Sequence, residues 1–213
     1  MLKKIIAVDG PAGAGKSTVS KILAARLGYT YIDTGAMYRA VALKVLKSGK
    51  NLDEKLISDI KIRLDEFARV FLDDCEVTAD IRTPEVSRGA SDVAKIGFVR
   101  EKLTELQREM AKSGSVIMDG RDIGTQVLPN ADLKIFLTAS VDERARRRFE
   151  EFKSKGIPTD FAQIRREILA RDEQDSTRAI APLAKAADAV LIDSTELSIE
   201  QVVAKILSLV ENN

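Results

Sequence analysis

The sequence predicts one α/β domain with a parallel sheet flanked by helices. Short apolar runs alternate with longer segments of helical periodicity, which is typical of a parallel sheet covered on both faces. The chain has 213 residues, of which 45% are hydrophobic, so it can bury a core without disulfides. The runs expected to form strands span residues 4–9, 29–33, 115–119, 133–139 and 189–193.

The first helices are marked by apolar spacing and by their ends. Residues 17–27 carry Val19, Ile22, Leu23 and Leu27 at helical spacing, and Gly28 ends the pattern. The segment 34–49 follows the second strand and ends at a glycine in the same way. Each helix therefore follows a strand directly, as in repeated strand–helix units.

The middle of the chain is less regular. Short alternating runs between residues 60 and 78 predict a small antiparallel sheet inserted into the main fold. Thr83-Pro84 has the pattern of a helix start, and residues 99–112 have helical periodicity.

Helices also dominate the second half. A basic helix is expected at 142–153, and Gly156 and Pro158 interrupt the pattern after it. Further helices are expected at 161–178 and, with an amphipathic pattern, at about 198–211.

Composition excludes several kinds of function. The net charge is +1, so no overall field favours nucleic acid or an anionic membrane. The chain has no histidine, which excludes a Ser-His-Asp triad and a His-ligated zinc. Cys75 is the single cysteine, and no apolar run reaches about 18 residues or has the form of a signal peptide. These features favour the cytoplasm and no membrane partner.

The strongest motif follows the first strand. Residues 10–17 fit G-x-x-x-x-G-K-[ST], between a predicted strand and a predicted helix. Backbone amides and the helix N-terminus would hold the phosphates of ATP, Lys16 would reach the β- and γ-phosphates, and Ser17 would bind Mg²⁺. The expected ATP-binding residues are Gly10, Pro11, Ala12, Gly13, Ala14, Gly15, Lys16, Ser17 and Thr18.

Polar residues follow two other predicted strands, at the sheet edge where ligands bind in open α/β folds. After the second strand, Thr34 is expected to cap the next helix through its hydroxyl, and Arg39 to project toward the crevice. After the strand at 115–119, Asp119 is expected to be a metal ligand, and the planar guanidinium of Arg121 is expected to bind a phosphate. Asp122 would accept a hydrogen bond from an exocyclic amine.

Two arginine-rich segments lie further along the chain. Arg171, Asp175 and Arg178 share one helix face, either as surface ion pairs or as contacts to a sugar and phosphates. Residues 144–148 are either a solvated helix face or part of a lid that brings arginine to the transferring phosphates.

Together the motifs resemble those of bacterial cytidylate kinases, a branch of the nucleoside monophosphate kinases. The matching segments are GPAGAGKST, DTGAMYR, TPEVS, the pair Ser91 and Arg100, DGRDIGT and RDEQDSTR, in the order of that family. The resemblance covers essentially the whole chain. Thr34 stands where some members have serine, and both residues keep a hydroxyl.

The resemblance implies a P-loop kinase core with an inserted α/β region that binds the monophosphate, and a lid. The core would comprise about residues 1–34, 113–140 and 180–213, the insertion 35–112 and the lid 142–160. The resemblance implies that Thr34, Arg39 and Arg121 lie near the CMP phosphate and Arg178 near the phosphates. It implies that Ser91, Arg100 and Asp122 lie at the cytosine, and Arg171 and Asp175 at the pentose. Lid arginines would include Arg144, Arg147 and Arg148, and the catalytic set would be Lys16, Arg121, Arg144, Arg148 and Arg178.

The expected reaction is ATP-dependent phosphorylation of CMP and dCMP, assisted by Mg²⁺ bound at Ser17 and Asp119, in a monomer. A carboxylate at position 122 accepts from the N4 amine of cytosine but faces a carbonyl in uracil, which gives a physical reason to prefer CMP to UMP. Rival hypotheses are a kinase for another monophosphate or for shikimate, and a nucleotide-dependent switch. Nucleic-acid binding has the least support, and the absence of an N-K-x-D motif weighs against a GTPase.

Overall fold

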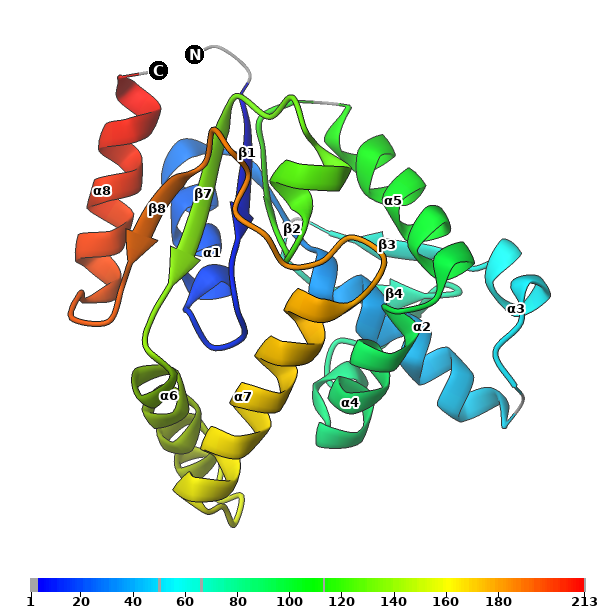
Figure 1. Cartoon of the computed structure of the whole chain (residues 1–213). Helices are drawn as coiled ribbons and strands as arrows, with labels where there is room; N and C mark the ends of the chain where they lie inside the picture. The colour runs from blue at the N-terminus through cyan, green and yellow to red at the C-terminus, as the bar shows by residue number, and fades with distance from the viewer. Residues whose placement is uncertain (1–3, 50, 66, 113, 213) are drawn as a thin grey trace.

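A computed structural model of the chain describes residues 4–49, 51–65, 67–112 and 114–212. Its main sheet has five strands in the order β2-β6-β1-β7-β8, and every neighbouring pair is parallel (Figure 1). The expected parallel α/β fold is thereby confirmed. The strands are β1 (Ile5–Asp9), β2 (Thr30–Asp33), β6 (Val116–Asp119), β7 (Leu133–Thr138) and β8 (Val190–Asp193).

Both faces of this sheet are buried, which explains the apolar runs in the sequence. Ile6 and Val8 of β1 pack on one face, with α1 (Lys16–Leu27) and α8 (Ile199–Glu211). Ala7 points to the opposite face, with α2 (Thr34–Ser48) and α5 (Gly97–Ala111).

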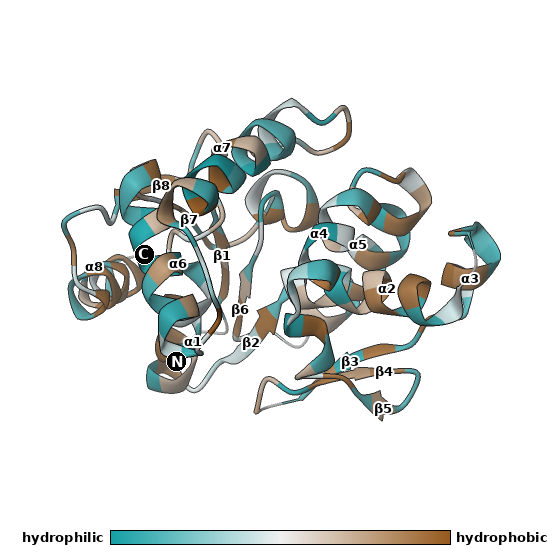
Figure 2. Ribbon diagram, turned by 90° about the horizontal axis from the view of Figure 1, so that it is seen from below, coloured by the Kyte–Doolittle hydropathy of each residue, from teal (hydrophilic) through white to brown (hydrophobic). Residues whose placement is uncertain are grey.

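The inserted sheet is also confirmed, and its strands β3 (Ile62–Leu64), β4 (Val70–Leu72) and β5 (Cys75–Glu76) pair antiparallel. Figure 2 shows this sheet beside α2, against which its buried side chains pack. The helix α4 (Pro84–Val93) begins as expected at Thr83, whose Oγ1 accepts a hydrogen bond from the Val86 amide at 3.2 Å. Two short helices had no clear signal in the sequence, α3 (Glu54–Ser58) and the 3₁₀-helix η1 (Asp80–Arg82).

A helix pair lies beyond the carboxyl ends of β1 and β7 (Figure 1). It consists of α6 (Val141–Ser154) and α7 (Phe161–Thr177), which pack through a small apolar cluster of their own. After β6 the chain forms one turn of π-helix, η2 (Ile123–Val127), which the sequence analysis did not predict. Over the described residues, no helix is long and apolar enough to cross a membrane.

Candidate active site

The loop between β1 and α1 has a backbone that depends on glycine. Gly10 has φ 144°, and a Cβ there would lie 1.9 Å from the carbonyl oxygen of Leu137 on β7. Gly15, with φ 92°, is the N-cap of α1 and has no side chain to cap the helix. The amides of the first turn of α1 are thus left to bind an anion, as the motif predicts.

Lys16 is buried beside this loop, with 5% of its surface exposed. Its Nζ donates a hydrogen bond to the Pro11 carbonyl oxygen at 2.8 Å. Burial, with a smaller contribution from Arg121, lowers the pKa of Lys16 to about 7. A buried ammonium without a bound counter-anion is destabilised, so a polyphosphate beside it would be bound strongly.

Asp119 ends β6 and faces the first turn of α1. Its Oδ2 accepts from Ser17 Oγ at 3.0 Å, and its Oδ1 accepts from Tyr31 Oη at 2.7 Å. Burial and the nearby charge of Asp33 raise the pKa of Asp119 to about 6. A hydroxyl and a carboxylate side by side fit Mg²⁺, which commonly takes few protein ligands and completes its shell with phosphate oxygens and water.

The start of α2 differs in one detail from the expected arrangement. The helix is capped by Asp33, whose Oδ1 accepts from the Ala36 amide at 2.8 Å. The prediction that Thr34 caps α2 was wrong, because its hydroxyl instead donates to the Asp119 carbonyl oxygen at 2.7 Å. Arg39 lines the cavity as expected and pairs with Asp33 at 3.1 Å.

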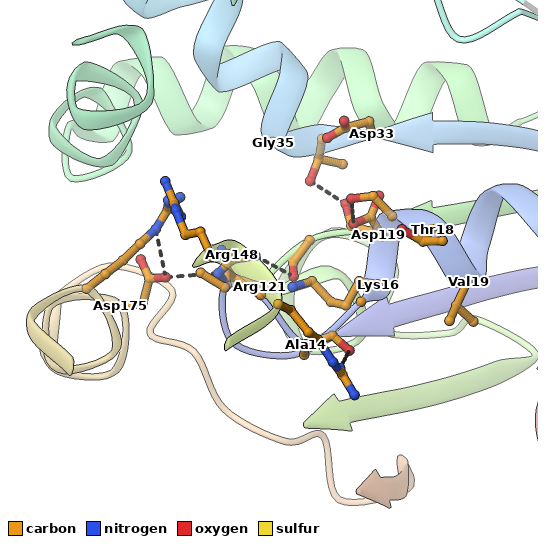
Figure 3. Close-up of a pocket in the computed structure, with 18 of the residues that line it drawn as sticks. Ala14, Lys16, Thr18, Val19, Asp33, Gly35, Asp119, Arg121, Arg148 and Asp175 are labelled. Carbon is orange, nitrogen blue, oxygen red and sulfur yellow. Dashed lines mark hydrogen bonds and ion pairs between the residues drawn. The ribbon is translucent and has the colours of Figure 1, made fainter. Parts of the chain in front are cut away.

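A cavity of about 800 Å³ runs from the phosphate loop to α4 and α7. Arg121 and Asp175 face each other in it, with Nε 2.9 Å from Oδ2 (Figure 3). Arg171 lies 4.0 Å from the same carboxylate. Burial alone would raise the pKa of Asp175, but Arg121 and Arg171 outweigh it and lower that pKa.

A second charged group lies at another wall of the cavity. Arg100 and Asp122 form a short ion pair in which both side chains are buried. Arg178 Nη2 lies 3.5 Å from Asp122 Oδ1 and its Nη1 lies 4.0 Å from Asp175 Oδ1, which joins the two groups. Ser91 lines the same cavity from α4.

The basic helix α6 uses its arginines in different ways. Arg148 lines the cavity, and its role as a lid arginine stays a prediction. Arg144 is only 4% exposed, is absent from the cavity wall, and pairs with Asp172 of α7. Arg147 donates to the carbonyl oxygens of Ala14 and Ser194 at 3.3 and 2.7 Å, which connects α6 to the phosphate loop.

Two buried arginine atoms lack a hydrogen-bond acceptor. Among the described residues, Nε of Arg39 and Nε of Arg171 are buried side-chain atoms without a hydrogen-bond acceptor. Buried polar atoms are usually satisfied, so these two call for an anionic ligand in the cavity. Arg39 and Arg171 line the same cavity as the phosphate loop, so an anion bound by these two atoms would share the cavity with that loop.

Sequence reasoning missed several polar residues that support the site. Tyr31 was placed in a strand without a role, and Asp33, Asp172 and Arg82 were given none, although Arg82 lines the cavity and lies 3.6 Å from Asp33. Tyr31, Asp172 and Arg82 act on residues distant in sequence, so no local pattern reveals them. Only the position of Asp33 before the second helix carried a signal, that of an N-cap.

A phosphate loop and an arginine-rich cavity on a parallel α/β sheet are the features of a P-loop kinase. A sequence profile described as "Cytidylate kinase" matches residues 6–212. The chain belongs to the cytidylate kinase family.

Curated relatives agree over nearly the full length. A cytidylate kinase of Caldicellulosiruptor bescii is 60% identical, with 98% of this chain and 96% of the relative covered. One of Leuconostoc mesenteroides subsp. mesenteroides is 54% identical with the same coverage. The solved shikimate kinase of Bacteroides thetaiotaomicron shares the fold, with a TM-score of 0.50 and 17% identity over 98% of each chain.

Proposed function

We propose that the chain transfers the γ-phosphoryl group of ATP to CMP and dCMP. The observation that carries this proposal is one cavity that joins the phosphate loop to the pairs Arg121–Asp175 and Arg100–Asp122. A nucleotide switch needs no second anion site, so the arginines beyond the phosphate loop favour a kinase with an anionic acceptor.

ATP would bind with its phosphates on residues 10–18 and Lys16. The CMP phosphate would lie among Arg39, Arg121 and Arg171, and the Nε atoms of Arg39 and Arg171 lack a hydrogen-bond acceptor. Thr34 would contribute to that end of the site. The pentose hydroxyls would contact Asp175, which is already held by arginines.

The cytosine would lie against Asp122 and Arg100, with Ser91 nearby. The N4 amine of cytosine donates to a carboxylate, and arginine donates to the O2 and N3 acceptors. Uracil would place a carbonyl oxygen against the Asp122 carboxylate, so two acceptors would face each other with no hydrogen between them. This gives the site a preference for CMP and dCMP over UMP.

The reaction needs no strong base, consistent with a chain without histidine. An ionised oxygen of the acceptor phosphate attacks the γ-phosphorus, the bond to the β–γ bridging oxygen breaks, and ADP leaves. Lys16, Arg121, Arg148 and Arg178 would neutralise the charge that is shared among the phosphates. Bound at Ser17 and Asp119, Mg²⁺ would add to that neutralisation.

The buried position of Arg144 changes its proposed role. In this conformation its donors are directed to Ala12, Ala139 and Asp172, so we assign it the positioning of the phosphate loop. Its direct contact with the transferring phosphates stays a prediction. The apolar face of α8 is buried on the core, which supports a monomer, and the cytoplasmic location likewise stays a prediction.

A coupled assay of ADP release tests the proposed function. ATP and Mg²⁺ are supplied with CMP, dCMP, UMP, AMP, GMP or shikimate in parallel. Strong release with CMP and dCMP and weak release with UMP is the expected result. Faster turnover with another acceptor would refute the base-recognition argument, and release that depends on no acceptor would favour the switch.

A further inference from the structure

Asp9 is a buried carboxylate at the carboxyl end of β1, next to the phosphate loop but outside the cavity wall. It is 5% exposed. Its Oδ1 accepts a hydrogen bond from the Ile123 amide at 2.8 Å, and its Oδ2 accepts one from the Gly124 amide at 2.7 Å. Both amides belong to the first turn of η2, so Asp9 satisfies the free N–H groups of a helix that lies 114 residues away.

The residue that ordinarily satisfies such amides is the one that precedes the helix. Here that residue is Asp122, a type strongly preferred as an N-cap, yet its side chain makes no capping hydrogen bond. Its carboxylate is directed instead to Arg100 and Arg178 in the cavity. Because Asp9 takes the amides, the Asp122 carboxylate remains available to a ligand.

We propose that Asp9 is the positioning residue for base recognition, because it caps η2 from β1 and so holds Asp122 toward the acceptor base. Asp9 does not line the cavity and both of its oxygens are occupied by amides, so it touches no substrate. Gly10 directly follows Asp9 in the chain. The end of β1 therefore fixes both the start of the phosphate loop and the turn η2, which Asp122 precedes. A π-helical turn at this place agrees with the frequent use of such turns at functional sites.

The surroundings of Asp9 make this contact sensitive to protonation. Burial raises the pKa of Asp9 to about 6, against the opposing effect of the two amides. The charge of Asp122 contributes to this rise, and the charge of Lys16 opposes it. The aliphatic part of the Lys134 side chain on β7 packs beside Gly124, and its ammonium is paired with Asp188. Protonation removes one acceptor and places a hydroxyl against an amide donor.

The variant Asp9→Asn tests the proposal, because it keeps the shape but places an NH₂ group against one of the two amides. We expect the ratio of kcat/KM for CMP to that for UMP to fall about tenfold, the scale of one lost buried hydrogen bond. The KM for ATP should change less than about twofold, since the amides of the phosphate loop are untouched. Asp132→Asn is the matched control, because Asp132 Oδ2 accepts from the Ile5 amide at 2.7 Å at the other end of β1.

A double-mutant cycle separates positioning from general destabilisation. In the Asp122→Ala background, Asp9→Asn should no longer alter the CMP/UMP ratio, since the residue through which it acts is gone. An unchanged ratio in the single variant, or an equal fall in both backgrounds, overturns the inference.

If Asp9→Asn does not fold, the pH dependence of the wild-type chain still tests the inference. Its CMP/UMP ratio should fall as the pH drops through about 6, and the phosphate ionisation shared by CMP and UMP cancels in that ratio. A flat ratio overturns the inference. The proposal rests on the proposed function: no preference for CMP in the wild type refutes both, whereas a preference lost in Asp122→Ala but kept in Asp9→Asn refutes this inference alone.

Discussion

Arg144 and Asp172 form a two-pronged ion pair between α6 and α7, with N–O distances of 3.0 and 2.7 Å. Arg144 Nη1 also donates to the Ala12 carbonyl oxygen at 3.2 Å, so one guanidinium connects both helices to the phosphate loop. Because α7 carries the residues proposed to bind the acceptor, this pair links the donor side of the site to the acceptor side.

Removal of the Arg144 guanidinium should destabilise the folded chain. We expect Arg144→Ala to lower the free energy of unfolding by about 2–3 kcal/mol, somewhat below the usual loss for a fully buried pair because Asp172 is partly exposed. Urea denaturation measures the effect. The control is Arg165→Ala, which removes an exposed pair with Asp142 between the same helices and should cost less than about 1 kcal/mol. Equal losses in both variants would contradict the role of Arg144.

Lys16 should take up a proton when nucleotide binds. Burial and Arg121 lower its pKa to about 7, and a polyphosphate beside it favours the ammonium and raises that pKa again. Near pH 8, calorimetry of ATP binding in buffers with different ionisation enthalpies should therefore detect proton uptake. Lys16→Met should remove the uptake. A wild-type binding enthalpy that is equal in all buffers would show that Lys16 is already charged.

Asp119 should set the magnesium requirement of the reaction. Burial raises its pKa to about 6, so below that pH the carboxylate is protonated and the Mg²⁺ concentration for half-maximal rate should rise. Tyr31→Phe removes a hydrogen bond that lowers this pKa, so the rise should begin at higher pH. Asp119→Asn should need more Mg²⁺ at every pH, and chelation with EDTA should stop turnover. A Mg²⁺ requirement in Asp119→Asn equal to that of the wild type would argue against this site.

Two glycine substitutions separate steric overlap from backbone strain. Gly10→Ala introduces a Cβ at a left-handed backbone position, 1.9 Å from the Leu137 carbonyl oxygen. It should lower the free energy of unfolding by about 3 kcal/mol or more. Gly28 has φ 68°, but a Cβ added there would have no atom within 4 Å. Gly28→Ala should therefore lower the free energy of unfolding by only about 1–2 kcal/mol. Thermal or urea unfolding compares them. A smaller loss in Gly10→Ala than in Gly28→Ala would refute the close approach of the loop to β7.

Much of the fold was predictable because it is encoded locally. The strand expected at 4–9 is Ile5–Asp9, and the helix expected at 17–27 is Lys16–Leu27, with Gly28 as its left-handed end. The ends of parallel strands meet at one edge, so the motifs after β1, β2 and β6 were expected to converge. They line one cavity.

The features that sequence reasoning missed depend on contacts between distant residues. Tyr31 donates to Asp119 across 88 residues, and Asp9 caps η2 across 114. Thr34 had the composition of an N-cap, but Asp33 occupies that position and leaves the Thr34 hydroxyl for the Asp119 carbonyl. A local pattern identifies a residue that can cap, whereas packing decides which amides it reaches.

The most direct test of the proposed reaction compares Asp122→Ala with the wild type, using kcat/KM for CMP and for UMP at saturating ATP and Mg²⁺. The wild type should prefer CMP strongly, and the variant should lose most of that preference while its affinity for ATP stays nearly unchanged, because Asp122 lies among the acceptor-side arginines. A CMP/UMP ratio that is the same in both proteins would contradict base recognition by Asp122.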